Sequence, residues 1–210
     1  MTSFFNPKNK NAFILYMVGR RNKGKSTLLI KMLLSPKYLK NKFHEVYLIN
    51  PTYEEDEKYH VVNFTDVITE YNPEDIMAIK LKCIEDLKTN PNKQTLIIFD
   101  DCIANKNFKS NNEDDILNEM AFNSRHYNIS TVILSQFYKG MSLMSRTQID
   151  YLIFFNNKNK REKDALYEEW GEGSKNDFIK FLETSFTGQY DFLLFDNKVD
   201  KVYKNFMLIV

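Results

Sequence analysis

The sequence predicts one α/β domain with a central, mostly parallel sheet, flanked by helices and completed by a C-terminal β-hairpin. Apolar runs of strand length alternate with longer segments of helical periodicity, as in chains built from strand–helix–strand units. Several of these runs are apolar throughout, which is typical of strands buried on both faces. With 210 residues, the chain has the size of a single domain spanning 1–210, with a core at about 13–155 and C-terminal helices and a hairpin at 159–210.

The pattern places the individual elements as follows. The first half should contain strands at 13–18, 45–50 and 95–101, a short strand at 59–64, helices at 27–34 and 73–88, and a polar surface loop at 102–115. The second half should contain a helix at about 113–126, strands at 129–136 and 151–155, helices at 161–170 and 175–184, and hairpin strands at 191–195 and 199–209.

A glycine-rich loop follows the first strand. Residues 19–26 fit the phosphate-loop pattern G-x-x-x-x-G-K-[ST] at every fixed position. The glycines let successive N–H groups turn toward phosphate oxygens at the positive end of the next helix. Lys25 would supply a charge for the β- and γ-phosphates, and the Ser26 hydroxyl would be a ligand of Mg²⁺. The fold is therefore expected to be a P-loop NTPase that binds ATP and Mg²⁺ through Gly19, Arg20, Arg21, Asn22, Lys23, Gly24, Lys25, Ser26 and Thr27.

Two acids end the strand at 95–101 and form a Walker B pattern. Asp100 is expected to hold the magnesium shell, and Asp101 to orient and deprotonate an attacking water. Gln136 ends the strand at 129–136 and should lie beside these acids, where it could sense the γ-phosphate or hold the water. The alternative for Asp100 and Asp101 is an acidic turn after a core strand. The alternative for Gln136 is an ordinary polar residue at the end of a strand.

Charge, cysteine content and hydropathy limit the possible partners and the cellular compartment. The net charge of +1 gives no global basic field, so any contact with nucleic acid has to be local. Cys83 and Cys102 are far apart and suggest neither a disulfide framework nor a metal cluster, which favours a reducing compartment. No signal-peptide core and no apolar run of membrane-spanning length is present, so we expect a soluble, intracellular protein.

Other phosphate-loop classes fit less well. A GTPase would carry glycine in the Asp-x-x-Gly position after Asp100 and a specificity carboxylate after Asn157–Lys158, and both are missing. A small-molecule or nucleotide kinase remains an alternative, although the chain has few arginines and its paired acids suit water activation. A domain that does not hydrolyse nucleotide would require Asp101 and Gln136 to be coincidental.

The phosphate loop, the paired acids, the segment 123–136 and Arg146 before the strand at 151–155 together resemble the DNA-packaging ATPases of large DNA viruses and virophages, in the FtsK–HerA superfamily. The resemblance runs from about Phe13 to the terminal hairpin. It implies an ATPase that forms a homo-oligomeric ring, a pentamer or hexamer, and drives double-stranded DNA into a preformed capsid, with capsid proteins as further partners. It also implies a location in the host cytoplasm or the virion. A related DNA pump that transfers plasmids or chromosomes is the alternative that the resemblance leaves open.

Ring ATPases commonly take an arginine from a neighbouring subunit. Arg125 precedes the strand at 129–136 and should lie about 20 Å or more from the nucleotide of its own subunit, so it could act only across an interface. Arg146 follows Gln136 and should lie closer to the carboxyl edge of the sheet, where the phosphates bind. We therefore rank it slightly ahead of Arg125 for this role. Each arginine could instead pair with a local carboxylate. Candidate DNA contacts are Lys106, Lys109, Lys158, Lys160, Arg161 and Lys163, which could equally be solvated surface charges.

Overall fold

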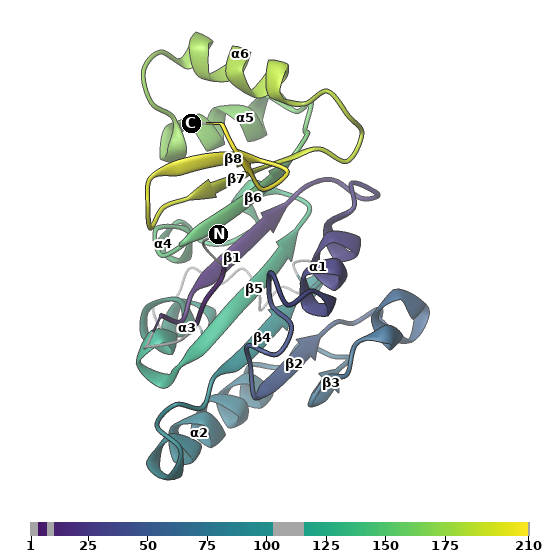
Figure 1. Ribbon diagram of the computed structural model, residues 1–210, viewed down its shortest axis with the longest axis vertical. Coiled ribbons are helices and arrows are strands. Elements are labelled where there is room, and N and C mark those ends of the chain that lie inside the picture. The colour runs from purple at the N-terminus through teal and green to yellow at the C-terminus, as the bar shows by residue number, and fades with distance from the viewer. Residues whose placement is uncertain (1–3, 8–10, 103–115, 210) are drawn as a thin grey trace.

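The computed structural model describes residues 4–7, 11–102 and 116–209. Within these residues, nine strands form one sheet in the order β3-β2-β4-β5-β1-β6-β7-β8-β9 (Figure 1). The strands from β3 to β6 in this order pair in parallel, and β7, β8 and β9 are antiparallel. The predicted fold class is thereby confirmed, including the terminal hairpin.

The bounds of the elements are as follows. The strands are β1 (Ile14–Val18), β2 (Glu45–Ile49), β3 (Asp66–Ile68), β4 (Thr95–Phe99), β5 (Ile129–Ser135), β6 (Tyr151–Phe155), β7 (Phe192–Asp196), β8 (Lys201–Lys204) and β9 (Met207–Leu208). The α-helices are α1 (Lys25–Leu34), α2 (Pro73–Thr89), α3 (Ile116–Asn123), α4 (Leu143–Arg146), α5 (Lys160–Trp170) and α6 (Lys175–Ser185). Short 3₁₀ helices are η1 (Tyr53–Glu55), η2 (Glu57–Val61), η5 (Ser124–Tyr127) and η6 (Tyr138–Gly140).

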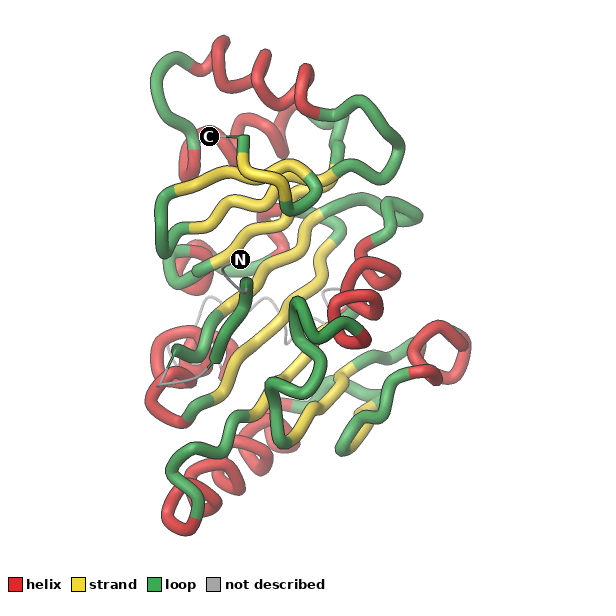
Figure 2. The backbone as a smooth tube through the Cα atoms, in the orientation of Figure 1, coloured by secondary structure: helices red, strands yellow, loops and turns green. Residues whose placement is uncertain are grey.

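Helices cover both faces of the sheet, and each face has its own hydrophobic core (Figure 2). Helices α2, α3, α5 and α6 pack on one face, against alternate strand residues such as Tyr16 and Val18. Helix α1 and the ring of Tyr59 pack on the other face, against Leu15 and Met17. Because successive side chains point to opposite faces, central strands buried on both sides have to be apolar throughout, as the sequence indicated.

The structure corrects several predicted elements. The strand expected at 59–64 is wrong, because residues 59–61 belong to η2, whose N-terminus is capped by the Asp56 side chain. Tyr59 is buried in the core. The edge strand β3 was not predicted. The helix expected at about 113–126 appears as α3 followed by η5, and most of the predicted loop at 102–115 lies outside the described residues.

The strand order decides where the predicted site residues meet. Strands β4, β5 and β1 are neighbours, and their parallel register pairs Phe99 with Ile133 and Val18 with Ser135. The residues that follow β1, β4 and β5 therefore emerge at the same carboxyl edge, which is where open α/β sheets bind ligands. In the part of the chain that the structure describes, no helix is long and apolar enough to cross a membrane.

Candidate nucleotide-binding and active site

The phosphate loop between β1 and α1 needs both of its glycines. The N–H of Gly19 donates to the Ser135 carbonyl at 3.0 Å, which fixes the loop on β5. A Cβ atom on Gly19 would lie 2.7 Å from the Cβ of Phe155 on β6, so only glycine fits there. Gly24, just before α1, has φ 89°, in the left-handed region that favours glycine. The first turn of α1, which is described in full, holds no acidic residue, so its N–H groups can attract an anion.

Lys25 lies across the loop that it is predicted to serve. Its Nζ donates to the carbonyls of Gly19 at 2.6 Å and Arg20 at 3.3 Å. Burial lowers the pKa of Lys25, and the nearby charges of Asp100 and Asp101 oppose that shift. The ammonium group is thus held among backbone oxygens near two carboxylates, where phosphate oxygens could take over its hydrogen bonds.

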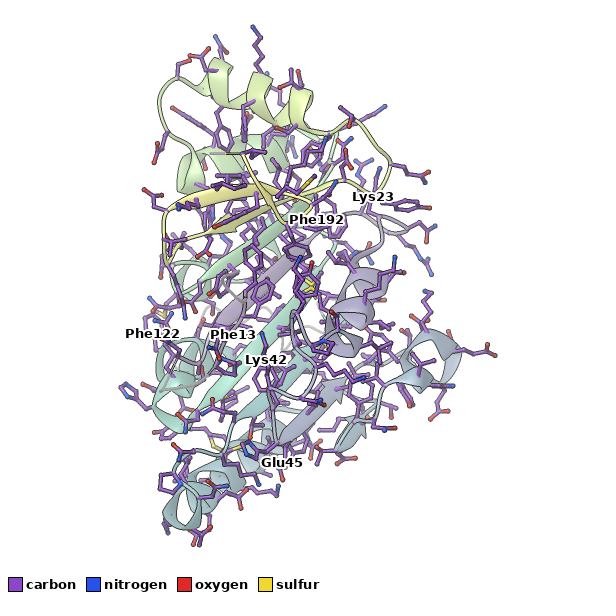
Figure 3. The ribbon with its side chains drawn as sticks, in the orientation of Figure 1. Phe13, Lys23, Lys42, Glu45, Phe122 and Phe192 are labelled. Carbon is purple, nitrogen blue, oxygen red and sulfur yellow. The ribbon has the colours of Figure 1, made fainter. Side chains whose placement is uncertain are left out.

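The variable positions of the loop face solvent. Arg20, Arg21, Asn22 and Thr27 are exposed, and Lys23 is partly buried. Figure 3 shows Lys23 at the end of the sheet where β7 begins with Phe192, and Glu45, the first residue of β2, at the opposite end. The variable positions of the phosphate loop therefore lie at the carboxyl edge of the sheet, mostly exposed to solvent.

Ser26 and Asp100 come together as predicted. The Ser26 Oγ donates to Asp100 Oδ2 at 2.8 Å. Two neighbouring oxygens of an octahedral magnesium shell, each about 2.1 Å from the ion, lie about 3 Å apart, so this pair fits Mg²⁺. Among the described residues there is no group of three or more histidine, cysteine or acidic side chains that could hold a metal. A magnesium ion here would take its other ligands from water and phosphate, as is usual for this ion with nucleotides.

Asp100 is buried, and its surroundings have two opposing effects. Burial raises the pKa of its carboxyl, while hydrogen bonds from Tyr59 and Ser26 and the charge of Lys25 lower it. The Tyr59 hydroxyl donates to Asp100 Oδ2 at 2.6 Å. Burial keeps the pKa of Tyr59 well above its ordinary value, so the phenol stays protonated and remains a donor. Tyr59 was missed by the sequence analysis because nothing in its local pattern marks it as part of the site.

Asp101 and Gln136 also meet. The Gln136 Nε2 donates to Asp101 Oδ1 at 3.2 Å, which confirms the predicted placement of the glutamine beside the Walker B acids. Asp101 is exposed and has φ 55°, a left-handed conformation that turns it away from the path of β4. The carboxylate is therefore open to solvent beside Lys25 and Asp100. The roles of Asp101 and Gln136 in water activation stay predictions.

The two arginines are not part of this cluster, and the expected location of Arg146 is corrected. Arg146 ends α4, is 8% exposed, and donates to the Glu169 carboxylate and to the Met141 carbonyl. Arg125 pairs with Asp150 at 3.1 Å, just before β6 and therefore at the amino edge, opposite the phosphate loop. Each arginine therefore pairs with a local carboxylate, which was the alternative to a role in catalysis.

The candidate DNA-binding residues that the structure describes lie in α5 or just before it. Lys158, Lys160 and Arg161 are exposed around the start of α5, whereas Lys163 pairs with Glu183 at 2.6 Å. Lys106 and Lys109 lie outside the described residues. Cys83 and Cys102 are buried free thiols.

The family model described as "Poxvirus A32 protein" matches residues 2–205. The chain belongs to this family. Over 181 residues it is 26% identical to the DNA packaging protein OPG160 of Vaccinia virus (strain Western Reserve), covering 82% of this chain and 64% of the relative. The same protein of Monkeypox virus is also 26% identical, and 57% of its length is covered. The chain thus spans somewhat less than two thirds of the curated relatives that it matches. Family membership agrees with the viral resemblance inferred from the sequence.

Solved structures share the fold at low sequence identity. The DNA-packaging ATPase B204 from Sulfolobus Turreted Icosahedral Virus aligns with a TM-score of 0.69 and 18% identity, over 91% of this chain and 96% of that chain. B204 from Sulfolobus turreted icosahedral virus 2, in complex with ATP-gammaS, aligns with a TM-score of 0.70 and 17% identity, over 98% and 100%. The pCW3 conjugation coupling protein TcpA with ATPgS gives a TM-score of 0.63 and 14% identity, over 95% and 61%. These likenesses show the P-loop fold alone.

Proposed function

We propose that this chain is an ATP-hydrolysing motor that translocates double-stranded DNA during the packaging of a viral genome. The observation that carries the proposal is the meeting of Lys25, Ser26, Asp100, Asp101 and Gln136 at one sheet edge, in a member of a family whose relatives are called DNA packaging proteins. Solved structures of the same fold contain ATP analogues.

The geometry supports a division of labour within the site. Loop N–H groups and Lys25 would bind the phosphates, and Ser26 and Asp100 would hold Mg²⁺, which neutralises charge on the β- and γ-phosphates. Asp101 would orient an attacking water and accept its proton. Gln136 would hold the Asp101 carboxylate in place through its hydrogen bond of 3.2 Å. An exposed carboxylate next to a buried one suits this role, because water can reach it.

The first experiment tests nucleotide chemistry. We expect Mg²⁺-dependent ATP hydrolysis by the wild-type chain and a severe loss of ATP affinity in Lys25→Ala, because a charge among the phosphates is removed. Lys31→Ala is the matched control, since it removes an exposed lysine from the last turn of α1, outside the phosphate loop, and should leave the ATP affinity unchanged. Equal ATP affinities in the wild type and Lys25→Ala would overturn the assignment.

The second part of the proposal is a homo-oligomeric ring, a pentamer or hexamer, around double-stranded DNA, with capsid proteins as docking partners. Lys158, Lys160 and Arg161 are the exposed candidates for phosphate contacts among the described residues. Binding through phosphates would have no sequence preference and would weaken steeply with salt, because counterions are released. Binding of a DNA duplex that is unchanged between low and physiological salt would contradict this part.

A shared active site remains part of the proposal, and Arg125 now becomes the first candidate for the arginine donated in trans. Its side chain is 41% exposed, whereas that of Arg146 is 7% exposed. Mixing Arg125→Ala subunits with Lys25→Ala subunits should restore ATP hydrolysis that is absent from either alone. Mixtures that co-assemble without any recovery would refute donation of Arg125 between subunits.

A further inference from the structure

Tyr59 brings an additional side chain to the nucleotide site from a segment outside the recognised motifs. It lies on η2, between β2 and β3, and is fully buried. Its ring belongs to the core beneath α1, and η2 contacts α1 directly. The hydroxyl is the only polar part of this side chain, and it ends 2.6 Å from Asp100 Oδ2.

We propose that Tyr59 is a positioning residue for magnesium, whose hydroxyl fixes the Asp100 carboxylate in the orientation that a bound Mg²⁺–ATP requires. The inference rests on the proposed ATPase function and goes beyond it, because it assigns a role to a residue of neither Walker motif. Ligating carboxylates are commonly held by hydrogen bonds from a surrounding shell, and loss of such a partner typically weakens metal binding by about 10–100-fold.

The hydrogen bonds around Asp100 support this role. Tyr59 and Ser26 both donate to Oδ2, at 2.6 and 2.8 Å. Ser26 approaches from the phosphate loop, and Tyr59 approaches from the buried interior. A carboxylate held in this way cannot rotate freely, so its orientation is set before any ion arrives. Among the described residues, Oδ1 accepts no hydrogen bond, so both donors hold the oxygen that lies 2.8 Å from the Ser26 Oγ.

The segment that carries Tyr59 is itself well fixed. The Tyr59 N–H donates to the Asp56 carbonyl at 3.2 Å, and the Val62 N–H donates to the Tyr59 carbonyl at 3.0 Å. The ring of Phe64 packs 6.1 Å from that of Tyr59. Backbone bonds on both sides and a buried ring make the phenol a rigid support for the carboxylate.

Burial alone does not explain the choice of partner. Tyr16 is equally buried, and its hydroxyl donates to the carbonyls of Phe137 and Tyr138. Neutral carbonyls are therefore sufficient for a buried phenol in this protein. Tyr59 instead donates to the buried carboxylate predicted to bind the metal, where a charge-assisted bond is shorter and stronger.

The experiment measures how strongly Mg²⁺ enhances ATP binding, as the ratio of the ATP Kd in EDTA to the ATP Kd in saturating Mg²⁺. Tyr59→Phe removes only the hydroxyl. We expect the ratio to fall by about tenfold or more while the Kd in EDTA stays unchanged, because the phosphate loop is intact. In Asp100→Asn the ratio should be strongly reduced, and adding Tyr59→Phe to that variant should change it no further.

Tyr47→Phe is the matched control. Tyr47 is also a buried tyrosine, and its hydroxyl bonds with Glu45 and Lys82, away from the carboxyl edge. Its loss should leave the ratio at the wild-type value. An unchanged ratio in Tyr59→Phe, or an equal loss of affinity with and without Mg²⁺, would overturn the inference. A wild-type chain that fails to bind ATP would instead overturn the proposed function and, with it, this role.

A measurement on the wild type covers the case in which Tyr59→Phe does not fold. Amide hydrogen exchange is compared between ATP with EDTA and ATP with Mg²⁺. We expect the Val62 amide, which is bonded to the Tyr59 carbonyl, to exchange more slowly when Mg²⁺ is present. The Lys93 amide, in a turn after α2, is the reference and should not change. Equal exchange at Val62 in both conditions would contradict the coupling.

Discussion

Gly19→Ala is the substitution whose effect follows most directly from the structure. The added Cβ would lie 2.7 Å from the Phe155 Cβ, whereas carbon atoms in contact prefer about 3.5–4.0 Å. Strand β1 or β6 would have to move by about 1 Å, although both are held in the sheet by paired neighbours. Overpacking of this kind costs about 1–3 kcal/mol. The same movement would displace the Gly19 N–H from the Ser135 carbonyl and distort the phosphate loop.

We therefore expect Gly19→Ala to lower the free energy of unfolding by about 1–3 kcal/mol in urea and to weaken ATP binding by about tenfold or more. Phe155→Ala should not rescue it, because the clashing atom is the Cβ that alanine keeps. Gly173→Ala is the control: its φ of 67° strains an alanine, but no atom lies within 4 Å, so ATP affinity should survive. A Gly19→Ala variant with wild-type stability and ATP affinity would refute this reasoning.

Three other perturbations test separate parts of the structure. Asp101→Asn should still bind ATP while turnover falls by about a hundredfold or more, since the base is lost; surviving turnover would move water activation to Gln136. The Asp191 pKa is depressed by hydrogen bonds, first that from Asn205, so its stabilisation is present above the unfolded pKa of about 4 and is lost at lower pH. Asp191→Asn should therefore lower the free energy of unfolding, measured in urea at pH 7, by about 1–2 kcal/mol. The same difference between variant and wild type at pH 3 would contradict this. Arg146→Ala should lower the free energy of unfolding by about 3 kcal/mol, because it breaks the largely buried ion pair with Glu169. A variant that unfolds at the same urea concentration as the wild type would show that the pair does not stabilise the fold.

The sequence was sufficient to locate the phosphate loop and the paired acids, because the spacing of Gly19, Lys25 and Ser26 is local and Asp100 directly ends an apolar strand. Gln136 could be placed beside Asp101 because parallel strands bring their carboxyl ends to one edge. Contacts between distant segments could not be predicted in the same way. Tyr59 reaches Asp100 across 41 positions, from a segment whose apolar residues suggested a strand.

The position of Arg146 shows the same limit. Its distance from Gln136 along the chain suggested a loop near the phosphates, but the chain instead turns through η6 and α4 on its way to β6. The guanidinium then pairs with Glu169, 23 positions further along. A partner on a later helix leaves no mark around the arginine itself, so sequence alone could not separate a catalytic arginine from a structural one.

The central claim is that ATP hydrolysis at this site moves the protein along double-stranded DNA. The most direct measurement is ATP-dependent displacement of a triplex-forming strand from a duplex, followed together with phosphate release. We expect displacement by the wild-type chain with Mg²⁺ and ATP, and none by Asp101→Asn, which still binds ATP. ATP hydrolysis that displaces no strand and is not stimulated by the duplex would contradict the account.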